Sequence, residues 1–135
     1  MQRDSRTADL LLLDDEPRVA AALTFAIEGS GFRLRTVAAP DHFWRELRLG
    51  IPDLVLLDVD LKQSSGLTVL RELRSRPATA ALPVFMLSGH IDPRLRTSAV
   101  SAGADEYISK PFDPDDLLMR IRRRLAVGVG ERGRR

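Results

Sequence analysis

Short apolar runs alternate with amphipathic stretches along the chain. The runs lie at residues 10–13, 32–37, 55–57, 84–87 and 107–108. Four of them are continuously apolar, which is typical of strands covered on both faces, whereas Phe32–Val37 alternates apolar and polar residues and predicts an edge strand. This regular alternation predicts an α/β fold with a parallel sheet.

Five amphipathic stretches predict helices between and after these strands. Pro17 marks the start of the first, in which Val19, Leu23 and Ile27 recur at four-residue spacing. The others are predicted over residues 41–49, around 67–73, after the cap residue Asp92 and after the cap residue Asp113.

The last predicted helix has a buried stripe formed by Leu117, Leu118, Ile121 and Leu125. Residues 127–135 contain three glycines and no helical period, so they predict a basic tail or linker. The sequence thus divides into an N-terminal extension over residues 1–8, one domain over 9–126 and the tail over 127–135.

A chain of 135 residues has room for one compact domain, and 44% hydrophobic with 30% charged residues is a soluble, globular balance. The absence of cysteine excludes disulfide scaffolds and thiolate chemistry, and two histidines leave little for a zinc site. No apolar stretch approaches the roughly 20 residues that cross a membrane, and the N-terminus lacks the apolar segment of a signal peptide. We therefore expect a cytoplasmic protein with no membrane partner.

Basic residues are concentrated at the end of the chain. Up to Met119 there are 14 Lys and Arg against 18 Asp and Glu, whereas the residues from Arg120 onward include seven Arg against Glu131. The arginines of the last helix form either a solvated face or a dimer contact with Asp105 and Glu106. No helix-turn-helix, wing or platform of aromatic and basic residues accompanies them, so we expect no direct nucleic-acid binding by this chain.

Polar side chains follow four of the predicted strands directly. They are Asp14 and Asp15, Asp58, Ser88 and Lys110. Because ligands of an open parallel sheet bind beyond the carboxyl ends of its strands, we expect these side chains to converge.

Three carboxylates in one place repel one another unless a cation lies among them. Magnesium prefers such oxygen ligands, and a lysine with a hydroxyl suits phosphoryl oxygens. One carboxylate then remains as a nucleophile that can form an acyl phosphate, and the central position of Asp58 favours that residue.

The same residues match the pattern of a known family. Gly66 lies eight residues after Asp58, Ser88-Gly89 thirty after it, and Lys110-Pro111 fifty-two after it. With the segments AGADEYISKPF and DLLMRIR, the chain resembles the receiver domain of two-component response regulators from about Asp9 to Leu125.

This resemblance implies a flavodoxin-like, doubly wound parallel sheet of five strands in the order 2-1-3-4-5, with five helices. It also implies that Asp58 is the phosphoacceptor and that Lys110 and Ser88 contact its phosphoryl group. Tyr107 would change rotamer as Ser88 moves. Mg²⁺ (or Mn²⁺) would be bound by the side chains of Asp15 and Asp58 and the backbone carbonyl of Asp60, with Asp14 assisting through water. Structural roles fall to Gly66 and Pro111, and a cis peptide bond before Pro111 is an expectation.

The implied partners are a sensor histidine kinase or a phosphotransfer protein. Phosphorylation would change the surface of the fourth helix, fifth strand and fifth helix, which could form a homodimer as in receivers attached to winged-helix domains. Such a protein is a switch that catalyses only its own phosphorylation and slow dephosphorylation. The cognate kinase, the output and whether the chain is a stand-alone regulator or part of a longer one remain open.

The sequence departs from the family pattern near the phosphoacceptor. Lys62 stands where the family usually has proline, which predicts a more mobile loop after the third strand. In the family, the positions of Asp60 and His90 border the site and tune dephosphorylation.

Three alternatives are open on the residues. The segment LVLLDVD resembles the Asp-x-Asp strand of haloacid dehalogenase phosphatases, but Leu61 and Lys62 replace the expected Gly and Thr. A flavodoxin-like nucleotide binder would need a phosphate loop where this chain has the acidic DDEP. A pseudo-receiver that binds without phosphorylation is the third, against which the complete acidic set and Lys110 argue.

Overall fold

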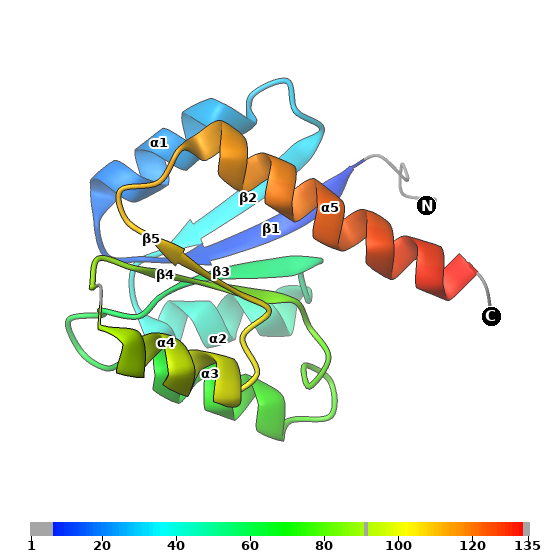
Figure 1. Ribbon diagram of the computed structural model, residues 1–135. Helices are drawn as coiled ribbons and strands as arrows, with labels where there is room; N and C mark the ends of the chain where they lie inside the picture. The colour runs from blue at the N-terminus through cyan, green and yellow to red at the C-terminus, as the bar shows by residue number, and fades with distance from the viewer. Residues whose placement is uncertain (1–6, 91, 134–135) are drawn as a thin grey trace.

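The computed structural model describes residues 7–90 and 92–133. Five strands alternate with five helices along the chain (Figure 1). The strands are β1 (Ala8–Leu13), β2 (Phe32–Val37), β3 (Leu54–Asp58), β4 (Val84–Ser88) and β5 (Glu106–Ser109). The helices are α1 (Pro17–Ile27), α2 (Pro40–Leu49), α3 (Gly66–Ser75), α4 (Pro93–Ser101) and α5 (Pro114–Gly133).

The strands form one parallel sheet in the order β2-β1-β3-β4-β5. This order confirms the predicted fold, and β2 lies at an edge as its alternating sequence predicts. The sheet reverses its winding between β1 and β3, so the carboxyl ends of these two central strands are where a ligand of a doubly wound sheet binds.

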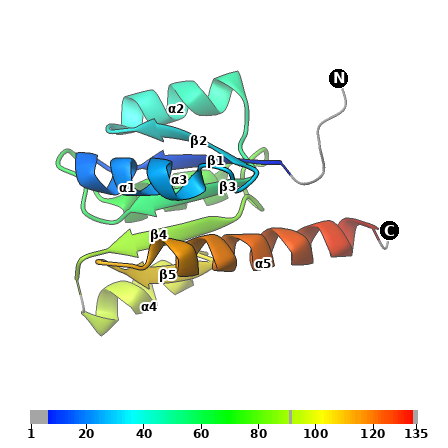
Figure 2. The ribbon, with the colours of Figure 1, turned by 90° about the horizontal axis from the view of Figure 1, so that it is seen from above.

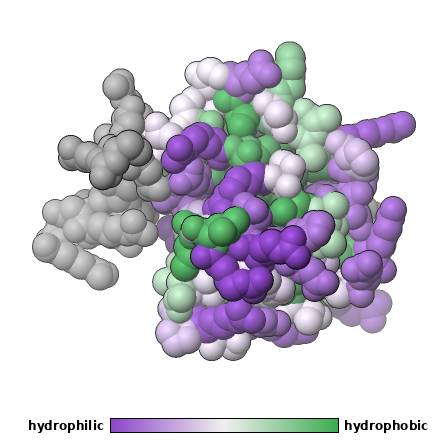
Figure 3. All heavy atoms as spheres, turned by 180° about the vertical axis from the view of Figure 1, so that it is seen from behind, coloured by the Kyte–Doolittle hydropathy of each residue, from purple (hydrophilic) through white to green (hydrophobic). Residues whose placement is uncertain are grey.

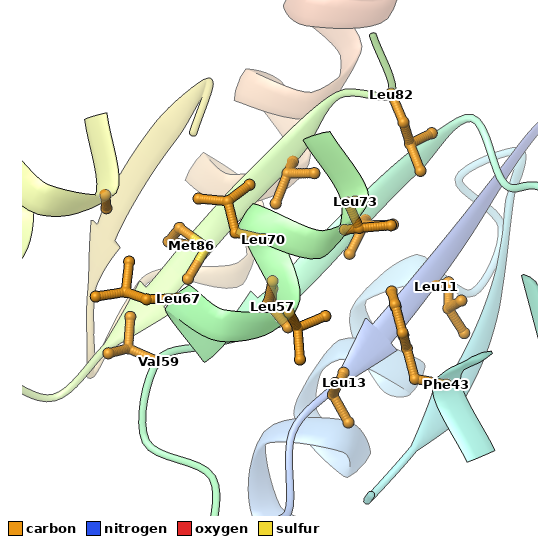
Figure 4. Packing of buried hydrophobic residues seen from close by; sticks show 14 of the residues in the cluster. Leu11, Leu13, Phe43, Leu57, Val59, Leu67, Leu70, Leu73, Leu82 and Met86 are labelled. Carbon is orange, nitrogen blue, oxygen red and sulfur yellow. The ribbon is translucent and has the colours of Figure 1, made fainter. Parts of the chain in front are cut away.

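Helices cover both faces of the sheet. Figures 1 and 2 show α1 and α5 on one face and α2, α3 and α4 on the other. Side chains of a strand alternate between faces, so Leu11 and Leu13 of β1 join the core beneath α2 and α3, which Figure 4 shows, whereas Leu10 and Leu12 join the core beneath α1 and α5. Burial on both faces explains why the central strands are continuously apolar.

Side chains cap the amino ends of α3, α4 and α5. Asp92 caps α4 by accepting a hydrogen bond from the Arg94 N–H, and the hydroxyl of Ser65 caps α3 by accepting one from the Leu67 N–H. The carboxylate of Asp113 accepts a hydrogen bond from the Asp115 N–H at the start of α5. These short-range contacts fix the loops that carry the site.

The last helix is longer than the sequence predicts. We expected it to end near Leu125, but α5 continues through Gly133 and extends beyond the sheet (Figure 1). The hydrophobic period is lost there because a helix without a packing partner needs no apolar stripe, and glycine disfavours helix by only about 1 kcal/mol each. The domain boundary at 126 stays a prediction.

Polar residues cover most of the surface that is seen from behind, with hydrophobic residues in scattered patches (Figure 3). Within the described ranges, no helix has the length and apolar character that a membrane span requires.

Candidate functional site

The carboxyl ends of the strands bring the predicted polar residues to one edge of the sheet. Asp58 is the last residue of β3 and Ser88 the last residue of β4, while Asp14 and Lys110 directly follow β1 and β5. Asp58 is 1% exposed and Asp14 is 4% exposed. The site is therefore built on the ends of rigid strands, with its two innermost carboxylates out of contact with bulk water.

Lys110 lies at the centre of the acidic side chains. Its Nζ is 2.8 Å from Asp14 Oδ2, 2.9 Å from Glu16 Oε1 and 3.3 Å from Asp58 Oδ1. The side chain of Lys110 is only 12% exposed, so its pairs with the buried Asp14 and Asp58 are shielded from solvent, whereas the side chain of Glu16 is largely exposed. The ammonium group offsets the repulsion among the carboxylates.

The two oxygens of Asp58 have different surroundings. Oδ1 accepts a hydrogen bond of 3.0 Å from the Asp60 N–H, besides facing Lys110. Oδ2 is buried and has no hydrogen-bond partner among the described residues. A buried carboxylate oxygen without a partner is costly, and it is the atom of this site that most needs a ligand.

The pKa of Asp58 is raised from 3.8 to about 6, and burial is the largest cause. The charge of Asp14 contributes to this rise, while the hydrogen bond from the Asp60 N–H and the charge of Lys110 oppose it. Burial by itself would lower the pKa of Lys110, but hydrogen bonds to Asp14 and Glu16 outweigh that effect and raise it. Lys110 therefore remains an ammonium at neutral pH, while Asp58 can gain or lose a proton under mildly acidic conditions.

Three carboxylates are close enough to share one metal ion. Oxygens of Asp14, Glu16 and Asp58 all lie within 4.8 Å of one another. Such hard oxygen donors fit Mg²⁺ or Mn²⁺, and the unpartnered Oδ2 of Asp58 supports that fit. Glu16 was not predicted as a site residue, although its position directly after the acidic pair in DDEP was a signal.

Asp15 is placed differently from the other predicted metal ligands. Its Oδ2 accepts a hydrogen bond of 2.7 Å from the N–H of Lys62, and it does not belong to the group of three carboxylates. Asp14, by contrast, is fixed locally, because its Oδ1 accepts a hydrogen bond of 2.9 Å from the Glu16 N–H.

Ser88 and two neighbouring side chains border Asp58. The buried hydroxyl of Ser88 accepts a hydrogen bond of 3.0 Å from the His90 N–H. Nε2 of His90 lies 2.9 Å from Asp60 Oδ1, and both side chains are largely exposed. Asp60 and His90, the two positions expected to border the site, therefore contact each other.

Tyr107 belongs to β5, one of the three elements of the surface formed by α4, β5 and α5. Its side chain is buried, and its hydroxyl has no hydrogen-bond partner in the part of the chain that the structure describes. The guanidinium of Arg96 lies 5.4 Å from the centre of the ring and donates a hydrogen bond to the Tyr107 carbonyl. A cavity of about 200 Å³ adjoins the ring, bounded in part by His90 and Ser109.

Gly66 and Pro111 shape the backbone around the site. A Cβ atom on Gly66 would overlap the backbone carbonyl of Asp58, so only glycine fits at the start of α3. The Lys110–Pro111 peptide bond is cis, as the sequence analysis expects.

Arginines of α5 pair with acidic residues of the same chain. Arg120 contacts Glu106 at 2.8 Å and Asp116 at 2.9 Å, and Arg124 contacts Asp105 at 3.3 Å. The groups predicted for a dimer contact are thus already paired within one chain.

Comparison with known proteins gives consistent matches. Residues 10–122 match the response regulator receiver domain family. The protein RcaC of Microchaete diplosiphon is 36% identical over 116 residues, which cover 86% of this chain and 18% of RcaC. The phosphate regulon transcriptional regulatory protein PhoB of Rhizobium meliloti is 33% identical over 116 residues, 86% of this chain and 51% of PhoB. The chain thus spans about half the length of these relatives or less.

Solved structures agree with these matches. A putative response regulator from Chloroflexus aurantiacus superposes with a TM-score of 0.83 at 32% identity, covering 89% of this chain and 98% of that one. The signal receiver domain of a signal transduction histidine kinase from Syntrophus aciditrophicus gives a TM-score of 0.80 at 30% identity, covering 90% and 92%.

Proposed function

Because the chain belongs to the response regulator receiver domain family of two-component systems, we propose that it is a switch whose phosphoacceptor is Asp58. The observation that carries this proposal is the buried, unpartnered Oδ2 of Asp58 beside the ammonium of Lys110. A receiver domain is not a conventional enzyme, since its own aspartate takes the phosphoryl group.

The proposed step is in-line transfer to a carboxylate. An oxygen of Asp58 attacks phosphorus, the bond between phosphorus and the donor's nitrogen or oxygen breaks, and an acyl phosphate forms while the donor leaves with the electron pair. A carboxyl group with a pKa of about 6 is mostly ionised at pH 7, so it is available as the nucleophile.

Lys110 and Ser88 are positioned to bind the phosphoryl group. The ammonium of Lys110 would pair with its oxygens, and the hydroxyl of Ser88 would donate a hydrogen bond to it while accepting the one from His90. A shift of Ser88 toward the phosphoryl group would then open space for Tyr107, which carries the change to the α4, β5 and α5 surface.

The acidic residues would hold the divalent cation. Side chains of Asp14, Glu16 and Asp58 are the group that lies together, and the side chain of Asp15 and backbone carbonyl of Asp60 are the further ligands expected from the sequence. When bound, magnesium or manganese supplies charge neutralisation at the phosphoryl oxygens.

The competing functions have less support. The relative PhoB is a transcriptional regulatory protein, and Leu61 and Lys62 replace the residues expected of a haloacid dehalogenase phosphatase. The acidic segment DDEP disfavours a nucleotide phosphate at α1. Convergence of the acids on Lys110 argues against a pseudo-receiver.

The proposed partner is a sensor histidine kinase or a phosphotransfer protein. Because such kinases use ATP, we place this function in the cytoplasm. The output, a partner or a further domain, would bind the α4, β5 and α5 surface. A second copy of the chain would bind there only after the ion pairs of Arg120 and Arg124 exchange partners.

We expect acetyl phosphate with Mg²⁺ to make the intact chain heavier by one phosphoryl group that hydroxylamine removes. The Asp58→Asn variant should remain unmodified because it lacks the nucleophile. Asp53→Asn is the matched control, since Asp53 directly precedes β3, at the end of the strand away from the site, and this variant should be modified like the wild type. Intact-mass spectrometry measures all three, and an unmodified wild type or a modified Asp58→Asn would contradict the proposal.

A further inference from the structure

The loop between β3 and α3 is tied to the acidic loop after β1 by one hydrogen bond. The backbone N–H of Lys62 donates to Oδ2 of Asp15 at 2.7 Å, across 47 residues of sequence. This is a short, charge-assisted hydrogen bond, the stronger kind in proteins.

Proline at this position would abolish the contact because proline has no N–H. The family usually has proline there, and Lys62 therefore supplies a donor that the family pattern lacks. The same loop also contacts the acceptor, since the Asp60 N–H donates to Asp58. Lys62 thus forms a contact between the two loops that proline could not form, while the predicted mobility of the loop stays a prediction.

A metal-binding carboxylate is commonly oriented by a hydrogen-bond donor outside the metal's own ligand set. Here the donor holds one oxygen of Asp15, and the other oxygen has no hydrogen bond to any residue the structure describes. Asp15 directly follows Asp14, whose carboxylate belongs to the group that fits a divalent cation.

We propose that the backbone amide of Lys62 is a positioning group that fixes the carboxylate of Asp15 for divalent-cation binding. This inference rests on the proposed function, which requires such a cation. The amide acts through Asp15 and does not itself touch the cation or the phosphoryl group. The exposed side chain of Lys62 has no part in it.

Two substitutions separate the amide from the side chain. Lys62→Ala removes the side chain and keeps the N–H, whereas Lys62→Pro also removes the N–H. The loop tolerates proline in the family, so the second variant is expected to fold, and the midpoint of thermal unfolding in EDTA checks that both variants remain native.

Isothermal titration calorimetry with MgCl₂ gives the affinity of each variant. We expect wild type and Lys62→Ala to bind equally and Lys62→Pro to bind about tenfold or more weakly, the usual effect of losing such a donor. Equal or tighter binding by Lys62→Pro relative to Lys62→Ala would overturn the inference. Failure of the wild type to bind Mg²⁺ would instead contradict the proposed function.

A double-mutant cycle tests whether the effect passes through Asp15. In an Asp15→Asn background, the proline should cause little further loss of Mg²⁺ affinity, because the carboxylate that it positions has been removed. An undiminished tenfold loss in that background would show that proline acts by another route and would overturn the inference.

Discussion

Asp58, the proposed nucleophile, is as buried as a core residue. Its carboxylate is 1% exposed, and its burial is the main reason that its pKa is raised to about 6. The folded state therefore favours the protonated form more than the unfolded state does. Stability from this group is fully present below pH 3.8 and is lost as the pH rises through 6.

Replacing Asp58 by asparagine should therefore stabilise the fold. A rise in pKa from 3.8 to about 6 corresponds to roughly 3 kcal/mol at pH 8, and to about half of that at pH 5, where the folded carboxyl group is largely protonated. Urea unfolding of Asp58→Asn and wild type in EDTA measures the difference at both pH values. The exposed change Glu28→Gln is the control, and a gain that does not depend on pH would contradict the account.

The ammonium group of Lys110 forms ion pairs with three carboxylates at once. It faces Asp14, Glu16 and Asp58 within 3.3 Å. A phosphoryl group on Asp58 would therefore meet an ammonium that is already positioned, and little reorganisation would be needed when charge develops.

At the scale of elements, the start of α3 controls the geometry of the end of β3. Gly66 packs so closely on the carbonyl of Asp58 that a Cβ atom cannot be accommodated. The N–H of Gly66 also donates to the Val59 carbonyl at 2.9 Å. The helix is thereby held against β3, which ends in the proposed phosphoacceptor Asp58.

We expect Gly66→Ala to lower the free energy of unfolding by about 1–3 kcal/mol, because the methyl group forces the backbone apart. The same change at Gly50 should have a small effect, since nothing lies within 4 Å of a Cβ atom there and its φ of 176° is extended. Urea unfolding of both variants measures the contrast. Equal effects at the two glycines would contradict the proposed contact.

In α5, the hydrophobic pattern does not predict where the helix ends. Its stripe ends at Leu125 because the packing on the sheet ends, but the backbone remains helical through Gly133. Periodicity reports burial, and a helix that extends beyond the core has no reason to keep it.

At the scale of the whole molecule, the centre of the site and the proposed output surface lie at different places on one sheet. The acidic site lies beyond the carboxyl ends of β1 and β3, whereas α4, β5 and α5 lie toward the other edge of the sheet. Ser88 ends β4, and Tyr107 lies on the neighbouring strand β5. Under the proposed function, these two buried side chains link a change at the site to the surface of α4, β5 and α5.

We expect the chain to be a monomer alone and a dimer with Mg²⁺ and beryllofluoride, as measured by light scattering. The physical reason is that Arg120 and Arg124 can exchange their exposed ion pairs for equivalent pairs on a second copy at small cost.

The Arg120→Glu variant should remain monomeric in both conditions because it places like charges beside Glu106 and Asp116. Arg45→Glu on α2, on the opposite face of the sheet from α5, is the control and should dimerise. A wild type that is monomeric in both conditions would exclude the dimer.

The order and kind of elements were determined by the sequence alone, because hydrophobic periodicity and capping residues act over a few neighbours. Asp14, Asp58, Ser88 and Lys110 could also be grouped from the sequence, since each ends or directly follows a strand of a parallel sheet.

Only the tertiary structure decided which of the acidic residues lie together. It brings Glu16 to Lys110, across 94 residues, and ties Asp15 to the amide of Lys62. It also pairs the arginines of α5 within the chain. These contacts depend on backbone groups and side-chain directions in segments that are distant in the sequence, and they leave no period or motif there. The sequence shows which oppositely charged residues exist, but only the folded chain shows which of them form pairs.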